Sequence, residues 1–308
     1  MVRYIKANQT EEFRESDRGL NAKDVWLENF DGTSKSVNRI CKILGIERED
    51  MVEAYIPNGV TNLGENVFCN CTFLTSITIP DSVTSIENYA FAGCTFLTSV
   101  TIGTGVKSIG GHAFAGCTSL KSITIPNSVT EIGSYVFYDC NSLTSIKIPN
   151  SVIRIDAGAF ERCTSLKNIT ISDSVMSIGI HAFDSCTSLT GITIPDSVTE
   201  IGEGTFDGCT SLTSVTIPNS VMSIDEWAFQ DCTSLTSVTI PNSVTRIGAW
   251  AFAHCKALTR VTIGNSVTNI GRQAFIGCTS LIITTNNPYV VDFCIDNDID
   301  YIDVSPSR

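Results

Sequence analysis

The sequence predicts a repeat solenoid, in which short coils stack so that their strands form a parallel β-sheet. Two observations predict this fold. Ten of the 13 cysteines recur every 23 residues, from Cys71 to Cys278, and a phenylalanine precedes each of them by three positions. A leucine follows each of the same cysteines by three positions, from Leu74 to Leu281. Because stacked strands lie about 4.8 Å apart, we expect about ten coils in a rod or arc on the order of 50 Å long.

One repeat, from Cys209 to Phe229, shows the elements expected in every coil. Leu212 to Ile217 alternates apolar and polar residues at its end, which predicts a short strand, and Pro218 ends that strand. A second extended piece, Ser-Val-x-x-Ile, follows. The next column is mostly glycine with some acidic residues, so we expect a left-handed turn there. The Ala-Phe-x-x-Cys segment that closes the coil is expected to form one helical turn.

The full pattern is Leu-x-x-Ile-x-Ile-Pro-x-x-Val-x-x-Ile-Gly-x-x-Ala-Phe-x-x-Cys, and it continues from residue 55 to residue 281 without a gap in period. This pattern resembles the BspA-like leucine-rich repeat. The resemblance implies a right-handed superhelix or arc with the parallel sheet on its concave face. Members of that family are often surface or secreted proteins that mediate adhesion and protein–protein contact, so the resemblance also implies a binding function.

The two ends of the chain differ from the repeats. Residues 1–50 are expected to form a helical N-terminal cap or, alternatively, a small interaction module. Within them, Ser36 to Leu44 is predicted as a short amphipathic helix, and Asp24 to Phe30 is a candidate for another. Residues 51–282 form the predicted solenoid and residues 283–308 a C-terminal cap. In that cap, Pro288 suits the first turn of a helix, and Ile299 to Val304 is predicted as a strand.

Composition excludes several classes of partner. The net charge of −12 argues against nonspecific binding to nucleic acid or to an anionic membrane surface. No apolar run approaches the roughly 20 residues of a membrane-spanning helix. The N-terminal residues lack the apolar stretch of a signal peptide, which favours an intracellular, cytoplasmic location. A surface or secreted location stays open because of the family resemblance.

The cysteine column is predicted to hold buried free thiols. Each cysteine of a stack has two equivalent neighbours with parallel side chains, and a linear column does not converge on a zinc ion. Cys41, Cys69 and Cys294 are left as the plausible reactive thiols. His112 and His181 lie three coils apart and cannot share a metal. We therefore expect no catalytic residues, no metal and no cofactor, and no enzyme activity.

Two sets of residues are candidates for partner binding. The outward strand positions are nearly all threonine, as at Thr193, Thr216 and Thr239, and are either a solvated sheet face or a hydroxyl array for a repetitive ligand such as a glycan, peptide or crystal surface. One column near the turn is irregular instead. It holds aromatic residues that are typical interface anchors or that shield the phenylalanine column, namely Tyr89, Tyr135, Trp227 and Trp250.

Acidic residues are concentrated in the second half of the repeats. Residues 168–245 contain nine acidic residues, among them Asp184, Asp207 and Asp231, and no lysine or arginine. This charge either attracts a basic partner or serves solubility.

The sequence thus favours a non-enzymatic protein–protein interaction scaffold or a subunit of a larger assembly. Two alternatives stay open. One is a cell-surface adhesin-like protein that binds a host protein or a glycan, and the other is a structural protein that presents its regular threonine array to a repetitive ligand.

Overall fold

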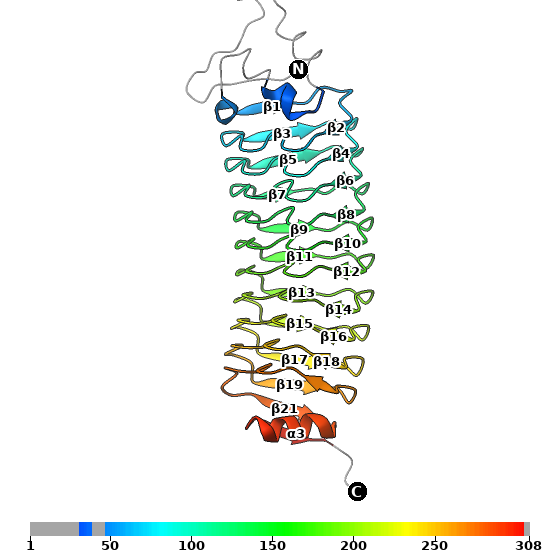
Figure 1. Cartoon of the computed structure of the whole chain (residues 1–308), viewed down its shortest axis with the longest axis vertical. Helices are drawn as coiled ribbons and strands as arrows, with labels where there is room; N and C mark the ends of the chain where they lie inside the picture. The colour runs from blue at the N-terminus through cyan, green and yellow to red at the C-terminus, as the bar shows by residue number, and fades with distance from the viewer. Residues whose placement is uncertain (1–30, 39–46, 305–308) are drawn as a thin grey trace, which may run out of the picture. The chain divides into compact units, whose positions relative to one another are not determined.

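The computed structural model describes residues 31–38 and 47–304, and the chain divides into two compact units, Met1–Val152 and Ile153–Arg308. Each unit is a parallel β-solenoid. Its coils stack so that the longer, odd-numbered strands form one column and the short, even-numbered strands form another (Figure 1). The predicted fold class, a solenoid of about ten turns with parallel strands, is confirmed.

In the first unit, the strands of neighbouring coils pair with an offset of one repeat. Ser76 lies opposite Ser99, for example, and Thr78 lies opposite Thr101. The short 3-10 helix η1 (Arg48–Asp50) precedes the first strand. The longer strands are β1 (Glu53–Tyr55), β3 (Ser76–Ile79), β5 (Ser99–Ile102), β7 (Ser122–Ile123) and β9 (Ser145–Lys147). The short strands are β2 (Asn62–Leu63), β4 (Ser85–Ile86), β6 (Ser108–Ile109) and β8 (Glu131–Ile132).

The second unit repeats this arrangement and adds a C-terminal cap. Its longer strands are β11 (Asn168–Thr170), β13 (Gly191–Thr193), β15 (Ser214–Thr216), β17 (Ser237–Ile240), β19 (Arg260–Ile263) and β21 (Ile282–Thr285). Its short strands are β10 (Arg154–Ile155), β12 (Ser177–Ile178), β14 (Glu200–Ile201), β16 (Ser223–Ile224), β18 (Arg246–Ile247) and β20 (Asn269–Ile270). The cap consists of α3 (Pro288–Asp296) and β22 (Asp300–Asp303).

The strands form where β-branched residues alternate with small polar ones. In β5, Val100 and Ile102 are buried, whereas Ser99 and Thr101 are exposed. Each strand therefore contributes its apolar side chains to the core and leaves its threonine on the surface. Proline follows the strand, and its carbonyl accepts the hydrogen bond that closes the next turn, as from the N–H of Val198 to Pro195 at 3.0 Å.

The segment that closes each coil is not the helical turn that the sequence predicts. The N–H groups of Tyr89, Phe91 and Gly93 donate to carbonyls of the next coil at 2.7–3.0 Å. The N–H groups between them donate to the carbonyl three residues earlier. Tyr89 and Gly93 both have a left-handed backbone, with φ of 57° and 72°. This alternation makes the segment a third hydrogen-bonded ladder between coils, which a helix cannot form because its N–H groups bond within the helix.

The glycine column that the sequence assigns to a left-handed turn is also different. Gly110, Gly248 and Gly271 are absent from the residues with positive φ. A Cβ atom at Gly110 would lie 2.7 Å from the backbone nitrogen of Asn88. Glycine is therefore favoured here because two coils approach closely, and the left-handed residue comes two positions later.

Two columns of side chains fill the core. The phenylalanine rings stack with centroids 5.2–5.8 Å apart from Phe68 to Phe137 in the first unit, and 5.1–5.5 Å apart from Phe160 to Phe275 in the second. The neighbouring cysteine thiols donate hydrogen bonds to phenylalanine carbonyls of the preceding coil. The Sγ of Cys117, for example, lies 3.2 Å from the oxygen of Phe91.

The predicted free thiols are confirmed for the described residues, since all twelve cysteines there are unbridged. Of the three thiols predicted to be reactive, Cys69 is partly exposed and burial raises its pKa. Cys294 is buried because α3 packs it against the last coil, and Cys41 lies outside the described residues. The reactivity of these thiols stays a prediction. Cys278, the last of the column, is also partly exposed.

The C-terminal cap has the predicted elements. The side chain of Asn287 accepts from the N–H of Tyr289, so it caps α3, and Pro288 begins the helix. Val290 is fully buried, and the ring of Phe293 meets Phe275 edge-on at 6.3 Å. The final strand β22 pairs in parallel with β21.

At the N-terminal end, residues 34–38 are helical, and the remainder of the predicted helix Ser36 to Leu44 lies outside the described residues, as does Asp24 to Phe30. Arg48 joins these helical residues to the first coil. Its guanidinium donates to the carbonyls of Ser34, Asn66 and Cys69 at 3.1–3.2 Å. In later coils the carbonyl at the position equivalent to Cys69 accepts a hydrogen bond from the preceding coil, as the carbonyl of Ala92 does from the N–H of Asn70. The carbonyl of Cys69 accepts from Arg48 instead, so this side chain supplies the donor that the first coil lacks.

We predict that Arg48→Lys destabilises the first unit by about 2 kcal/mol. The reason is that the ammonium group of lysine cannot donate to all the carbonyls that the planar guanidinium of Arg48 reaches. Urea denaturation followed by circular dichroism measures the change, and hydrogen exchange should show faster exchange at residues 64–71. Lys107→Arg, an exposed exchange between the same two residue types, is the matched control. Equal stability of the two variants would contradict this assignment.

We also predict that Cys117→Ala destabilises the first unit by about 1–2 kcal/mol, because it removes a fully buried side chain and the thiol donor to Phe91. Cys69→Ala, at a partly exposed position outside the column, should change the unfolding free energy by less than about 0.5 kcal/mol. Equal changes of the unfolding free energy in the two variants would contradict this contribution of the column.

Candidate interaction surface

The irregular column of the sequence is the column of left-handed residues, which we call the turn ridge. All ten of its members have φ between 53° and 60°. In the first unit they are Asn66, Tyr89, His112 and Tyr135. In the second unit they are Gly158, His181, Gly204, Trp227, Trp250 and Gln273. The structure thus places all four aromatic candidates, Tyr89, Tyr135, Trp227 and Trp250, at equivalent positions.

The left-handed backbone is unfavourable for most ridge residues. Glycine and asparagine adopt it readily, whereas an ordinary side chain loses roughly 1–2 kcal/mol. The ridge nevertheless carries tyrosine, histidine and tryptophan at φ of 53–57°. The conformation persists because the backbone is held by neighbours, as where the N–H of Trp227 donates to the carbonyl of Ala249 at 3.1 Å. Sequence reasoning identified the column but missed its conformation.

The ridge of the first unit is a stack of aromatic rings. The His112 ring lies between those of Tyr89 and Tyr135, at 4.7 Å and 4.9 Å and with interplanar angles of 6° and 10°. Tyr138 meets Tyr135 edge-on at 6.1 Å. Burial lowers the pKa of His112, so the stacked imidazole is neutral at physiological pH.

The ridge of the second unit contains a tryptophan pair extended by an arginine. The rings of Trp227 and Trp250 stack at 6.0 Å with an interplanar angle of 20°. The guanidinium carbon of Arg272, from the following coil, lies 4.2 Å from the centre of the Trp250 ring. The indole N–H of Trp250 donates to Oε1 of Gln273 at 2.7 Å. The sequence predicts the tryptophan pair, but Arg272 and Gln273 were missed.

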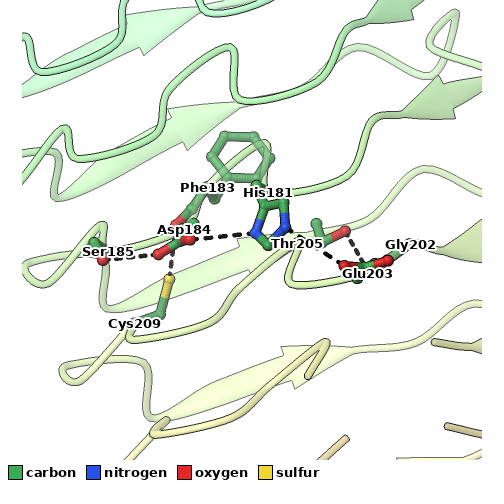
Figure 2. A network of polar contacts seen from close by, with 8 residues as sticks. All are labelled: His181, Phe183, Asp184, Ser185, Gly202, Glu203, Thr205 and Cys209. Atoms are coloured by element: carbon green, nitrogen blue, oxygen red, sulfur yellow. Dashed lines mark hydrogen bonds and ion pairs between the residues drawn. The ribbon is translucent and has the colours of Figure 1, made fainter. Parts of the chain in front are cut away.

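Within the ridge of the second unit, His181 lies between two carboxylates (Figure 2). Its Nδ1 is 3.2 Å from Asp184 and its Nε2 is 3.8 Å from Glu203. The hydroxyl of Ser185 donates to the other oxygen of Asp184 at 2.7 Å. Neither His181 nor Glu203 was among the candidate residues, because only the fold shows which columns face each other.

Further acidic side chains surround Asp184. Burial, together with the negative charges of Asp184 and Asp231, raises the pKa of Asp207 to about 6, whereas His181 and Gln230 oppose the shift. Burial and the charge of Asp184 also raise the pKa of Glu161. The three predicted aspartates therefore belong to one electrostatic cluster. Over the part of the chain that the structure describes, no group of three or more potential ligands is arranged to hold a metal ion.

The threonine candidates lie elsewhere in the coil. Thr193, Thr216 and Thr239 are exposed on the longer strands β13, β15 and β17. Thr193 lies directly opposite Thr216 in the parallel ladder. The candidates of the second unit therefore belong to two separate surfaces, the turn ridge with its acidic neighbours and the strand face, and Tyr89 and Tyr135 belong to the ridge of the first unit.

Comparison with known proteins gives the family. A model of the BspA-type leucine-rich repeat region, in six copies, matches residues 47–167 and 153–282. The chain belongs to the BspA-type leucine-rich repeat family. No match was found among curated proteins.

Several solved structures are similar to this BspA-type protein. A leucine-rich repeat protein from Bacteroides ovatus has 26% identity and a TM-score of 0.44, and the match covers 82% of this chain and 91% of that one. A leucine-rich cell surface protein from Faecalibacterium prausnitzii has 28% identity and a TM-score of 0.37, with 82% and 88% covered. The leucine-rich repeat protein of T. pallidum has 26% identity and a TM-score of 0.40, with 75% and 86% covered. Among the described residues of this chain, no helix has the length and apolar character needed to span a membrane.

We predict a pH-dependent effect of Asp207→Asn. The pKa of this carboxyl is raised from its ordinary 3.8 to about 6 in the folded chain. Below about pH 4 it is protonated in both states and contributes nothing. As pH rises from about 4 to about 6, the unfolded chain releases its proton first, so the fold loses stability, and above about 6 the loss is complete.

Asparagine at this position removes that loss. Asp207→Asn should leave stability unchanged near pH 4 and raise it by about 1 kcal/mol at pH 7, a value below the full linkage because the carboxylate is partly solvated. Urea denaturation at both pH values measures the difference. The exposed Asp196→Asn is the control, and an equal gain in both variants would contradict the cluster.

Proposed function

We propose that this BspA-type leucine-rich repeat protein is a non-enzymatic scaffold that binds a protein partner through the turn ridge and acidic residues of its second unit. The observation that carries the proposal is the presence of tryptophan at two consecutive left-handed positions, 227 and 250, in the unit that contains the acidic cluster around Asp207. Such a scaffold fits a family of stacked repeats, in which each coil adds surface without a catalytic cleft.

The tryptophans contribute little net stability at these positions. A stacked aromatic pair is worth about 0.5–1.5 kcal/mol, which is less than the roughly 2–4 kcal/mol of left-handed strain at two such positions. Asparagine would occupy the same backbone with less strain, as it does at Asn66. Tryptophan is among the residues most enriched at the energetic centres of interfaces. We therefore assign these side chains to binding.

The rest of the repeat is monotonous by comparison. The segment TSLTSVTIPNS is identical at residues 210–220 and 233–243, so its exposed threonines present the same surface twice. A site for one protein partner needs distinct anchors instead, and the ridge provides them. The acidic residues between 168 and 245 add long-range attraction for a basic partner.

The proposal is tested with affinity-tagged full-length chain and an extract of its native source. We predict that Trp227→Asn combined with Trp250→Asn lowers the unfolding free energy by no more than about 1.5 kcal/mol, because relief of the left-handed strain at two positions offsets the loss of the stack. Partner capture should nevertheless fall at least about tenfold, as expected for removal of two anchors. Quantitative mass spectrometry of the captured proteins measures the loss.

Thr216→Ala combined with Thr239→Ala is the matched control on the strand face. It should leave capture unchanged. Loss of capture in the threonine variant, with retention in the tryptophan variant, would overturn the proposal and move the site to the hydroxyl array.

A further inference from the structure

The tryptophan stack of the second unit is covered at one end and open at the other. Arg272 and Trp227 come from the coils on either side of Trp250, and each packs against its ring. On the other side of Trp227, the equivalent ridge residue is Gly204, which has no side chain. Among the described residues, Trp250 is the only aromatic ring in contact with Trp227. The ring face of Trp227 that is turned toward Gly204 therefore has no ring stacked on it.

At Gly204 the ridge carries no side chain that could stack on Trp227. A Cβ atom there would lie 2.3 Å from Nδ1 of His181, so the histidine ring already occupies the space of a side chain. His181 is held in that position by Asp184 and Glu203. The residue that precedes Trp227 in the ridge thus cannot provide a stacking partner, and a partner for Trp227 must come from another molecule.

The charge around this ring face is negative. Glu203 precedes Gly204 and is half-buried beside His181, and Glu226 precedes Trp227 and is exposed to solvent. The two coils are joined where the N–H of Gly204 donates to the carbonyl of Glu226 at 2.9 Å. Asp207 adds a carboxylate whose pKa is raised by burial and by the negative charges of Asp184 and Asp231. Arg246, the next basic residue along the chain, is engaged in an ion pair with Asp225.

We propose that the Gly204-facing side of Trp227 binds the guanidinium of an arginine from the protein partner. The bound arginine would lie on Trp227 as Arg272 lies on Trp250, and would close the stack from its open end. Arginine suits this place better than lysine, because its planar group stacks on an indole while its N–H groups reach carboxylates. This inference rests on the proposed function and adds the chemistry of the partner residue.

The experiment uses the full chain with Trp26→Phe, so that the two ridge tryptophans give the remaining indole N–H signals in an NMR spectrum of ¹⁵N-labelled protein. The probe is the peptide acetyl-Gly-Arg-Gly-amide, titrated at pH 7. Comparison peptides carry citrulline, which is planar but neutral, or lysine, which is charged but not planar. We expect a saturable shift of the Trp227 signal with the arginine peptide, and binding about five- to tenfold weaker with either comparison peptide.

Two variants test the residues involved. Glu203→Gln combined with Glu226→Gln should weaken arginine-peptide binding by about three- to tenfold. Asp173→Asn combined with Asp196→Asn removes the same charge from exposed turns away from the ridge and should leave binding unchanged. In the Trp227 variants, binding is followed through the indole signal of Trp250. Trp227→Phe, which keeps a smaller ring, should retain part of the arginine-peptide binding, whereas Trp227→Asn should abolish it.

The inference is overturned if the Trp227 signal does not move, if citrulline binds as well as arginine, or if the two pairs of carboxylate variants behave alike. Its failure is separable from that of the proposed function. Without arginine binding, loss of partner capture in the tryptophan variant would still support the ridge as an interaction surface. Arginine binding with unchanged capture would instead reject the ridge as the site for the native partner.

Discussion

The structure depends on hydrogen bonding between coils at a fixed offset of 23 residues. Three ladders run through each unit, one through the longer strands, one through the short strands and one through the segment that closes the coil. A coil is held by these ladders only if its backbone follows the same path as its neighbours. Each position along the repeat therefore inherits its φ and its direction from the stack, whatever residue occupies it.

This constraint acts differently on inward and outward positions. Inside, one residue type satisfies the geometry in nearly every coil, because Phe91 must stack on the rings of two neighbours and the thiol of Cys117 must reach the carbonyl of Phe91. Outside, the backbone is equally fixed but the side chain is not. Trp227 and Gly204 therefore share a left-handed conformation although their side chains differ as much as two residues can.

The period of the sequence was enough to predict the parallel strands, the phenylalanine stack and the buried thiols, because each follows from repetition alone. Conformation within the coil was harder to predict. Gly110 suggested a left-handed turn, yet it is required by contact with Asn88, and the left-handed residue is His112. Both explanations favour glycine, so composition could not separate them.

The candidate surface shows the same division. The tryptophan pair was predictable because residues 227 and 250 share a column, which places them one coil apart. The contacts of Arg272 with Trp250 and of His181 with Asp184 were not predictable from the sequence, because each joins residues of different columns. Their distances depend on the turn conformation that the sequence did not reveal.

The two ridges show how one backbone can support different chemistry. In the first unit, a neutral His112 fills the space between two tyrosines, and the positions equivalent to Glu203 and Asp207 in those coils are uncharged. In the second unit, glycine interrupts the rings, and a glutamate directly precedes both Gly204 and Trp227. Because the backbone is the same in both, this difference arises from the outward side chains alone.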